Sequence, residues 1–285
     1  MRTRWLSILM AVIILATTLT GCAVEVFIDT PRAPLTVHVL DVGQADSILV
    51  QTAKKSMLID GGNRADADGI MDYLRSQGVK ELDVVVATHP HTDHIGGLVD
   101  IVKDFPVAQV YMPRVAHTSK TYEDLLINIK NAGLKITPVK PGLTVELDSG
   151  IEAVFLAPAR SDYDNLNNYS AVLRLGFQNT SFLFSGDAEA EAEEEMLASG
   201  FDLSSTVLKV GHHGSNTSTT SEFLAAVNPE VAVISVGADN SYGHPSEQVL
   251  KRLEEADIRV FRTDIHGVIT ISSDGLKLTV LTDRS

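Results

Sequence analysis

The chain has 285 residues, of which 44% are hydrophobic and 21% are charged, a balance typical of a folded globular protein and not of a disordered one. It carries 23 Lys and Arg residues against 37 Asp and Glu residues, a formal net charge of −14. This acidity opposes non-specific attraction to nucleic acid, because that attraction depends on neutralising phosphates. A phosphate-containing substrate would therefore have to be held by metal ions or by a local basic patch.

The first 21 residues are typical of a targeting segment. Arg2 and Arg4 precede an uncharged stretch, residues 5–20, whose apolar core is shorter than the ~20 residues of a membrane-spanning helix. The stretch ends in Leu-Thr-Gly-Cys at residues 19–22, which resembles the lipobox of bacterial lipoproteins, where a signal is removed before a cysteine that becomes acylated. Cys22 is the only cysteine, so the mature domain cannot form an internal disulfide.

These features predict three segments and a location. Residues 1–21 are expected to be a lipoprotein signal peptide, residues 22–34 an acylated cysteine with a tether, and residues 35–285 the folded domain. The protein is then extracytoplasmic and anchored to a membrane through lipid. An uncleaved membrane anchor is the alternative, and it predicts the same side of the membrane.

The folded part is predicted to mix β-hairpins with strand-helix-strand units. Alternating apolar runs predict strands at residues 35–40, 47–51 and 56–59, and a helix follows at residues 67–77. An apolar run at residues 82–87 predicts a buried strand. The later elements are expected in the order strand 107–112, strand 151–156, strand 171–177, strand 181–184, helix 188–198, strand 206–210, helix 221–227, strand 231–236, helix 247–256, strand 268–272 and strand 276–280. This order fits a four-layered αββα sandwich, in which two mixed sheets lie face to face with helices outside.

The strongest chemical signal directly follows the predicted strand at residues 82–87. The next seven residues read Thr-His-Pro-His-Thr-Asp-His and contain three imidazoles and a carboxylate. In extended backbone, residues two apart project to the same side, so His89 and His91 can share one metal while Asp93 and His94 turn towards a second. An exposed polar loop is the plainer interpretation, but the buried strand before it and the two glycines after it favour a metal site.

Other candidate ligands also follow predicted strands. Asp187 comes after the strand at residues 181–184 through a Ser-Gly turn, although it also suits the N-cap of the next helix. His212 and His213 lie in a glycine-flanked turn. Adjacent side chains in extended backbone point to opposite faces, so one of the two is not expected to be a ligand. For His244 three interpretations are open: a third metal ligand from the second half of the chain, a proton donor to the leaving group, or a loop histidine without a role.

The chain resembles the metallo-β-lactamase superfamily, and specifically the metal-dependent hydrolase domain of ComEC-type competence proteins. The resemblance covers nearly all of residues 35–282. It rests on several motifs in the same order, namely Asp41-Val42-Gly43-Gln44-Ala45-Asp46-Ser47, Leu58-Ile59-Asp60-Gly61-Gly62, the histidine motif, Asn167-Asn168-Tyr169-Ser170, Phe184-Ser185-Gly186-Asp187, Lys209-Val210-Gly211-His212-His213-Gly214-Ser215 and Tyr242-Gly243-His244-Pro245.

This resemblance implies a centre of two divalent metal ions, zinc or manganese. The implied ligands are His89, His91, Asp93, His94, Asp187 and His212. Asp187 would bridge the metals, Asp93 would also orient the nucleophile, and His244 would stabilise charge or protonate the leaving group.

Supporting and substrate-binding residues are implied in the same way. Asp60 would hydrogen-bond a ligand imidazole from behind. The candidates for contact with the substrate are Asn168, Lys209, His213, Ser215 and Asn216.

Two positions depart from the family pattern. Ala45 stands where glycine is usual. Many members of the superfamily use a histidine as the third ligand of the first metal, and here two asparagines, Asn167 and Asn168, occupy that region. Because asparagine is a weak oxygen ligand, the first site is expected to be open or rich in oxygen and to favour Mn²⁺ over Zn²⁺ more than a site of three histidines would.

The resulting hypothesis is a phosphodiesterase, most simply a nuclease acting on DNA, with a DNA-uptake channel protein as a candidate partner. Two features stand against this hypothesis: the acidic charge, and the aromatic content of 6%, which leaves few rings for stacking single strands. Hydrolysis of a phosphorylcholine or teichoic-acid phosphodiester, a lactone or a β-lactam remains an alternative. A non-catalytic binding subunit that keeps the fold is a further one.

Overall fold

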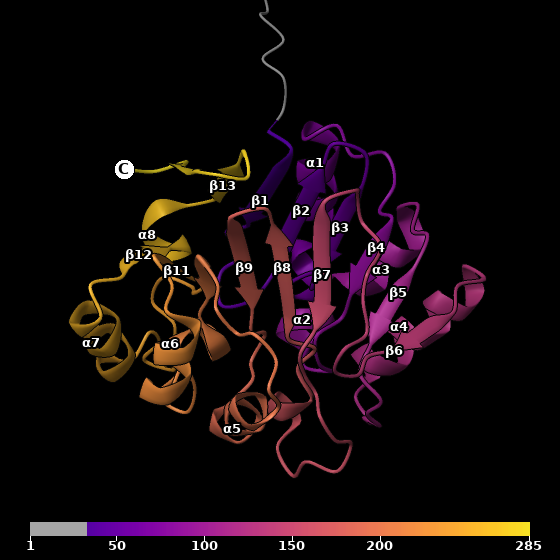
Figure 1. Ribbon diagram of the computed structural model, residues 1–285. Helices are drawn as coiled ribbons and strands as arrows, with labels where there is room; N and C mark the ends of the chain where they lie inside the picture. The colour runs from indigo at the N-terminus through magenta and orange to yellow at the C-terminus, as the bar shows by residue number, and fades with distance from the viewer. Residues whose placement is uncertain (1–32) are drawn as a thin grey trace, which may run out of the picture. The chain divides into compact units, whose positions relative to one another are not determined.

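Two β-sheets pack face to face in the structure, a computed structural model that describes residues 33–285 (Figure 1). The predicted signal peptide, the predicted lipidation site Cys22 and most of the predicted tether lie outside the described residues. Among the residues that are described, no helix has both the length and the apolar character needed to cross a membrane.

The first sheet has eight strands and is built mainly from the N-terminal half of the chain. Its order is β14-β13-β1-β2-β3-β4-β5-β6. Pairing is antiparallel from β14 to β3 and parallel from β3 to β6. The strands are β1 (Leu35–Val39), β2 (Ile48–Thr52), β3 (Ser56–Ile59), β4 (Val84–Val86), β5 (Val110–Met112), β6 (Ile136–Pro138), β13 (Ile269–Ser273) and β14 (Leu278–Thr282).

The second sheet has six strands in the order β12-β11-β10-β9-β8-β7. Here β12 to β9 are parallel, and β9 to β7 are antiparallel. The strands are β7 (Ile151–Phe155), β8 (Leu173–Phe177), β9 (Thr180–Phe184), β10 (Val207–Lys209), β11 (Val231–Ile234) and β12 (Arg259–Arg262). Each sheet therefore joins an antiparallel part to a parallel part.

Helices cover the outer face of each sheet. The first sheet is covered by α1 (Ala67–Ser76), α3 (Leu98–Asp104) and α4 (Lys120–Asn131), and the second by α5 (Ala190–Ala198), α6 (Ser221–Val227) and α7 (Glu247–Glu255). The short helices are α2 (Thr92–Ile95), α8 (Thr263–His266) and the 3₁₀ turns η1 (Arg64–Asp66), η2 (Leu166–Tyr169) and η3 (Gly211–Gly214).

Three hydrophobic clusters separate these four layers, and the strand sequences explain them. Side chains alternate between the faces of a strand, so Val84 and Val86 of β4 enter the cluster between the sheets while Val85 packs against the helices. In β9, Phe182 and Phe184 face the first sheet and Leu183 faces helices α5 to α7. The predicted four-layered αββα sandwich is confirmed.

Several elements differ from the sequence prediction. The strands predicted at residues 82–87 and 206–210 are shorter, Val84–Val86 and Val207–Lys209. The prediction omitted the helix α4 and the strands β6 and β12. Both strands lie at sheet edges and are partly exposed, so they lack the alternation that marks a half-buried strand.

Candidate metal centre

The histidine motif occupies the turn between β4 and α2, directly at the end of a buried parallel strand. His91 is the extended residue that precedes α2, so the chain turns into a helix at once and brings His94 back over the strand end. His89 and His94 are buried, and His91 is partly exposed. The Nε2 atom of His89 lies 2.9 Å from Nδ1 of His91, and both nitrogens can therefore approach one ion.

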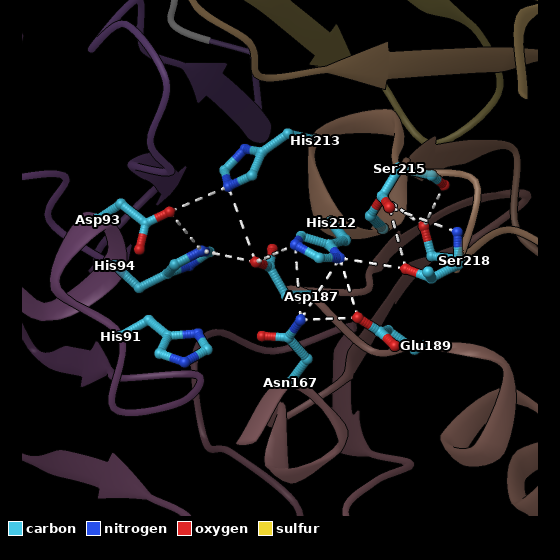
Figure 2. Close-up of polar contacts among 12 residues, drawn as sticks. His91, Asp93, His94, Asn167, Asp187, Glu189, His212, His213, Ser215 and Ser218 are labelled. Carbon is cyan, nitrogen blue, oxygen red and sulfur yellow. Dashed lines mark hydrogen bonds and ion pairs between the residues drawn. The ribbon is translucent and has the colours of Figure 1, made fainter. Parts of the chain in front are cut away.

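Asp187, which follows β9 in the other sheet, lies at the centre of the imidazoles (Figure 2). Its Oδ2 atom is 3.2 Å from Nε2 of His94, 3.7 Å from Nε2 of His213, and 3.8 Å from Nε2 of both His89 and His212. The carboxylate is thus surrounded by nitrogens from both halves of the chain, which is the position a ligand shared by two cations must occupy.

Asp93 completes a second group on one side of Asp187. Its Oδ2 atom lies 3.4 Å from Nε2 of His213 and 3.8 Å from Nε2 of His94. Asp93, His94, Asp187 and His213 each offer one ligand atom, and these four atoms lie within 4.8 Å of one another. Two carboxylate oxygens and two imidazole nitrogens are a donor set suited to zinc or manganese.

Unsatisfied atoms in this group support a cation site. Within residues 33–285, the buried atoms His94 Nε2, His213 Nε2 and Asp187 Oδ1 have no hydrogen-bond partner, although such buried groups are normally paired. Burial by itself lowers the pKa of His94, but the carboxylates of Asp187, Asp60 and Asp93 raise it well above the ordinary histidine value. The residues present therefore fit a divalent cation, whose charge would replace that proton.

The outer nitrogens of two imidazoles are fixed by hydrogen bonds. His94 Nδ1 donates to Asp60 Oδ2 over 2.8 Å, and His213 Nδ1 donates to the Ser235 carbonyl over 2.9 Å. Asp60 also accepts hydrogen bonds from the backbone N–H of Thr88 at 2.8 Å and from its hydroxyl at 2.6 Å. In both histidines the second nitrogen, Nε2, is left to face Asp187.

His212 and His213 adopt left-handed backbone conformations, with φ of 47° and 53°. The expectation that their side chains point to opposite faces is wrong, because it assumed extended backbone. Both Nε2 atoms face Asp187 instead. Non-glycine residues with positive φ store strain of order 1–3 kcal/mol and cluster at functional sites.

The two histidines differ in their surroundings. His213 is buried and belongs to the group with Asp93 and His94. The side chain of His212 is 24% exposed, and its Nδ1 atom lies 3.1 Å from Glu189 Oε1. The structure thus groups His213 with Asp93 and His94, and His212 stands beside Glu189.

An open pocket of about 290 Å³ lies above the centre, and ten residues line it: Gln44, His91, Thr92, Asp93, Asn167, Asp187, His212, His213, Tyr242 and His244. His244 stacks on Tyr242, with ring centroids 5.7 Å apart. Gln44 Oε1 accepts from Gly237 N at 3.1 Å, and its Nε2 is 3.4 Å from His244 Nδ1. Gln44 and Tyr242 belong to quoted sequence motifs, yet the sequence alone gave neither a role.

Four residues predicted to contact the substrate, Asn168, Lys209, Ser215 and Asn216, do not line this pocket. Lys209 is 2% exposed and pairs with Asp46 at 2.8 Å. The side-chain amide of Asn168 is already hydrogen-bonded at both ends. Its oxygen accepts from the backbone of Glu189, and its nitrogen donates to the carboxylate of Glu191. The Ser215 hydroxyl lies 3.0 Å from the Thr217 hydroxyl.

Comparison with known proteins shows the family of the chain. The model of the metallo-β-lactamase superfamily matches residues 40–238. The chain belongs to the metallo-β-lactamase superfamily. Solved structures of this fold include the diiron β-hydroxylase CmlA from Streptomyces venezuelae (14% identity, 86% of this chain and 55% of that one, TM-score 0.56) and YhfI from Bacillus subtilis (12%, 83% and 99%, TM-score 0.54). At these identities the likeness shows the superfamily fold alone.

The chain is also similar to proteins whose names refer to competence and recombination. ComE operon protein 3 of Bacillus subtilis is 32% identical over 82% of this chain and 32% of its own length. Competence protein ComA of Neisseria gonorrhoeae is 35% identical over 84% of this chain and 32% of its own. Recombination protein 2 of Haemophilus influenzae is 29% identical over 83% and 28%. The chain thus spans about a third of the length of these relatives.

Proposed function

We propose that this protein is a metal-dependent phosphodiesterase that cleaves DNA outside the cytoplasm. The observation that carries the proposal is the convergence of four imidazole nitrogens on one buried carboxylate oxygen, Asp187 Oδ2, at the floor of an open pocket. Relatives named as a competence protein and a recombination protein support DNA as the substrate.

Two sets of side chains would hold the metals. His89, His91 and Asp187 would hold the first ion, and Asp93, His94, His213 and Asp187 the second. Bound divalent cations supply positive charge that polarises a phosphoryl oxygen and lowers the pKa of a water molecule. Asp60 and the Ser235 carbonyl keep the ring nitrogens aimed at the pocket, which preorganises the centre.

Gln44 and His244 suit a hydrogen bond to an oxygen that gains negative charge in the reaction. The Gly237 N–H donates to Gln44 Oε1, so the amide directs its N–H group towards His244 Nδ1. Burial, followed by the nearby His212 and His213, lowers the pKa of His244. The neutral imidazole then accepts at Nδ1 and holds its proton at Nε2, which can donate a hydrogen bond to that oxygen.

The side chains that line the pocket bear on how a substrate would be held. In the described part of the chain, no lysine or arginine lines the pocket, so the negative charge of a phosphodiester has no cationic side chain there to meet it. Tyr242 is 72% exposed at the rim, and its ring offers a face on which a nucleobase can stack. The metal ions would therefore have to balance the charge of a phosphodiester, and the exposed ring of Tyr242 favours a nucleotide.

The test uses the full-length chain, stripped of metal with a chelator and reloaded with Mn²⁺ or Zn²⁺. Cleavage of single-stranded DNA, double-stranded DNA and bis-p-nitrophenyl phosphate is measured for the wild type and for His91→Ala. His266→Ala, which removes an imidazole that does not line the pocket, is the matched control.

Metal-dependent cleavage of DNA that is lost only in His91→Ala is the expected result. Cleavage of the small diester alone would retain the metal centre and reject DNA as the substrate. No cleavage of any of the three by the metal-loaded wild type would contradict the phosphodiesterase proposal and favour a lactonase or a binding role.

The extracytoplasmic location rests on the sequence of residues 1–22. A Cys22→Ser protein is expected to leave the membrane fraction, because acylation requires the thiol. If that protein still sediments with membranes, the lipid anchor is wrong.

A further inference from the structure

Asn167 carries an unsatisfied oxygen beside the first metal position. It belongs to η2, is 6% exposed, and lines the pocket with His91, Asp187 and His212. Its Oδ1 atom is buried and, within residues 33–285, accepts no hydrogen bond. In Figure 2 this oxygen is turned to the side of His91. A buried amide oxygen without a donor costs about 1–3 kcal/mol, so it requires a partner that the protein chain does not provide.

Glu189 fixes the orientation of this amide. Asn167 Nδ2 donates to Glu189 Oε1 over 2.8 Å. A carboxylate only accepts hydrogen bonds, so a flipped amide would set oxygen against oxygen. Glu189 is itself held by Asn165 Nδ2 at 2.9 Å and by His212 Nδ1 at 3.1 Å. The oxygen of Asn167 is therefore the end directed away from Glu189.

The neighbouring asparagine shows the contrast. Asn168 Oδ1 accepts the backbone N–H of Glu189 at 3.0 Å, and its Nδ2 donates to Glu191 at 2.9 Å. Asn168 thus attaches η2 to the start of α5 with both ends of its amide. Of these two adjacent asparagines, both buried in the described structure, only Asn167 has a free acceptor.

We propose that the amide oxygen of Asn167 is a ligand of the first metal ion, beside His89 and His91, and that Glu189 holds it in that orientation. The inference rests on the metal centre of the proposed function. A neutral oxygen joined to two imidazoles is a harder and weaker donor set than three imidazoles, so the first site should favour Mn²⁺ over Zn²⁺ more than a site of three imidazoles would. The second site, with Asp93, His94 and His213, should not depend on Asn167.

Metal binding by the full-length chain tests this assignment without an activity assay. Calorimetric titration of the metal-free wild type with Mn²⁺ is expected to show two ions. Asn167→Ala should weaken one of them by at least the ~10- to 100-fold that loss of a supporting partner costs. Asn167→Asp should still bind both ions. Asn167→His should shift the preference of the first metal site from Mn²⁺ towards Zn²⁺. Asn179→Ala, which changes an exposed asparagine in the turn between β8 and β9, is the control and should keep both affinities.

A double variant identifies the affected site. His91→Ala should weaken the same ion, and Asn167→Ala combined with His91→Ala should cause no loss at the other site. Two Mn²⁺ ions bound by Asn167→Ala with wild-type affinities would overturn the role of Asn167 and leave the metal centre standing. A wild type that binds neither Mn²⁺ nor Zn²⁺ would overturn the metal centre itself. Should Asn167→Ala fail to fold, an unchanged Mn²⁺-to-Zn²⁺ preference in Asn167→His would also overturn the assignment.

Discussion

Replacing Lys209 by methionine is expected to destabilise the fold strongly. Lys209 of β10 and Asp46, from the loop after β1, form an ion pair of 2.8 Å between the two halves of the chain, and each is 2% exposed. Lys209 Nζ also donates to the Val210 carbonyl at 3.0 Å. Removing Lys209 leaves the buried Asp46 carboxylate without its lysine and beside His213, whose Nδ1 lies 3.5 Å from Asp46 Oδ1. Breaking a buried ion pair in this way costs about 3–5 kcal/mol.

The matched variant is Asp46→Asn combined with Lys209→Met, which removes both charges. Because the cost in the single variant comes from an unpaired charge, the double variant should recover most of the lost free energy of unfolding. Urea denaturation in the presence of chelator measures both variants without a contribution from bound metal. This reasoning is refuted if Lys209→Met lowers the free energy of unfolding by less than about 1 kcal/mol. It is also refuted if the double variant is less stable than either single variant.

Three further changes test other parts of the structure. Gly97→Ala should abolish folding, because its Cβ would lie 2.0 Å from the Gly61 carbonyl oxygen; Gly69→Ala, whose Cβ meets nothing within 4 Å in the described part of the chain, should add about 0.5–1 kcal/mol to the unfolding free energy. Urea midpoints check both. Tyr242→Ala should raise KM for single-stranded DNA several-fold and leave kcat for the small diester unchanged; an equal KM for DNA would reject the stacking role. Burial and a hydrogen-bonded carboxylate raise the pKa of Tyr163 to about 12. Because this pKa is raised, the stability that Tyr163 contributes is complete below pH 10 and is lost as the pH rises through 12. Tyr163→Phe should not show this loss of stability in alkaline denaturation. In an absorbance titration it should lack the phenol group that ionises near pH 12.

The strand ends that carry the site were predictable, because their signals are local. The apolar run before His89 and the turn before Asp187 place polar side chains at the ends of buried strands, whatever the rest of the chain does. Helix α4 was missed although its signal is present, since Tyr122, Leu125 and Ile129 recur at helical spacing and are buried. That omission was one of interpretation.

Other features depend on contacts that local sequence does not contain. Lys209 was predicted to contact the substrate from its place in a motif, and its burial follows from Asp46, which is distant in sequence. The left-handed conformations of His212 and His213 are held by the fold, because neither residue prefers positive φ. The free oxygen of Asn167 likewise depends on the position of Glu189.

The metal ligands come from both sheets, and this has a consequence for unfolding. Asp93 and His94 follow a strand of the first sheet, and Asp187 and His213 follow strands of the second. An ion bound by all four would act as a removable cross-link that closes roughly ninety residues of chain between Asp93 and Asp187. Whether metal is bound would then decide whether the two halves of the chain unfold together or separately. A protease added to the chelated protein should cut first in the segments that join the two halves.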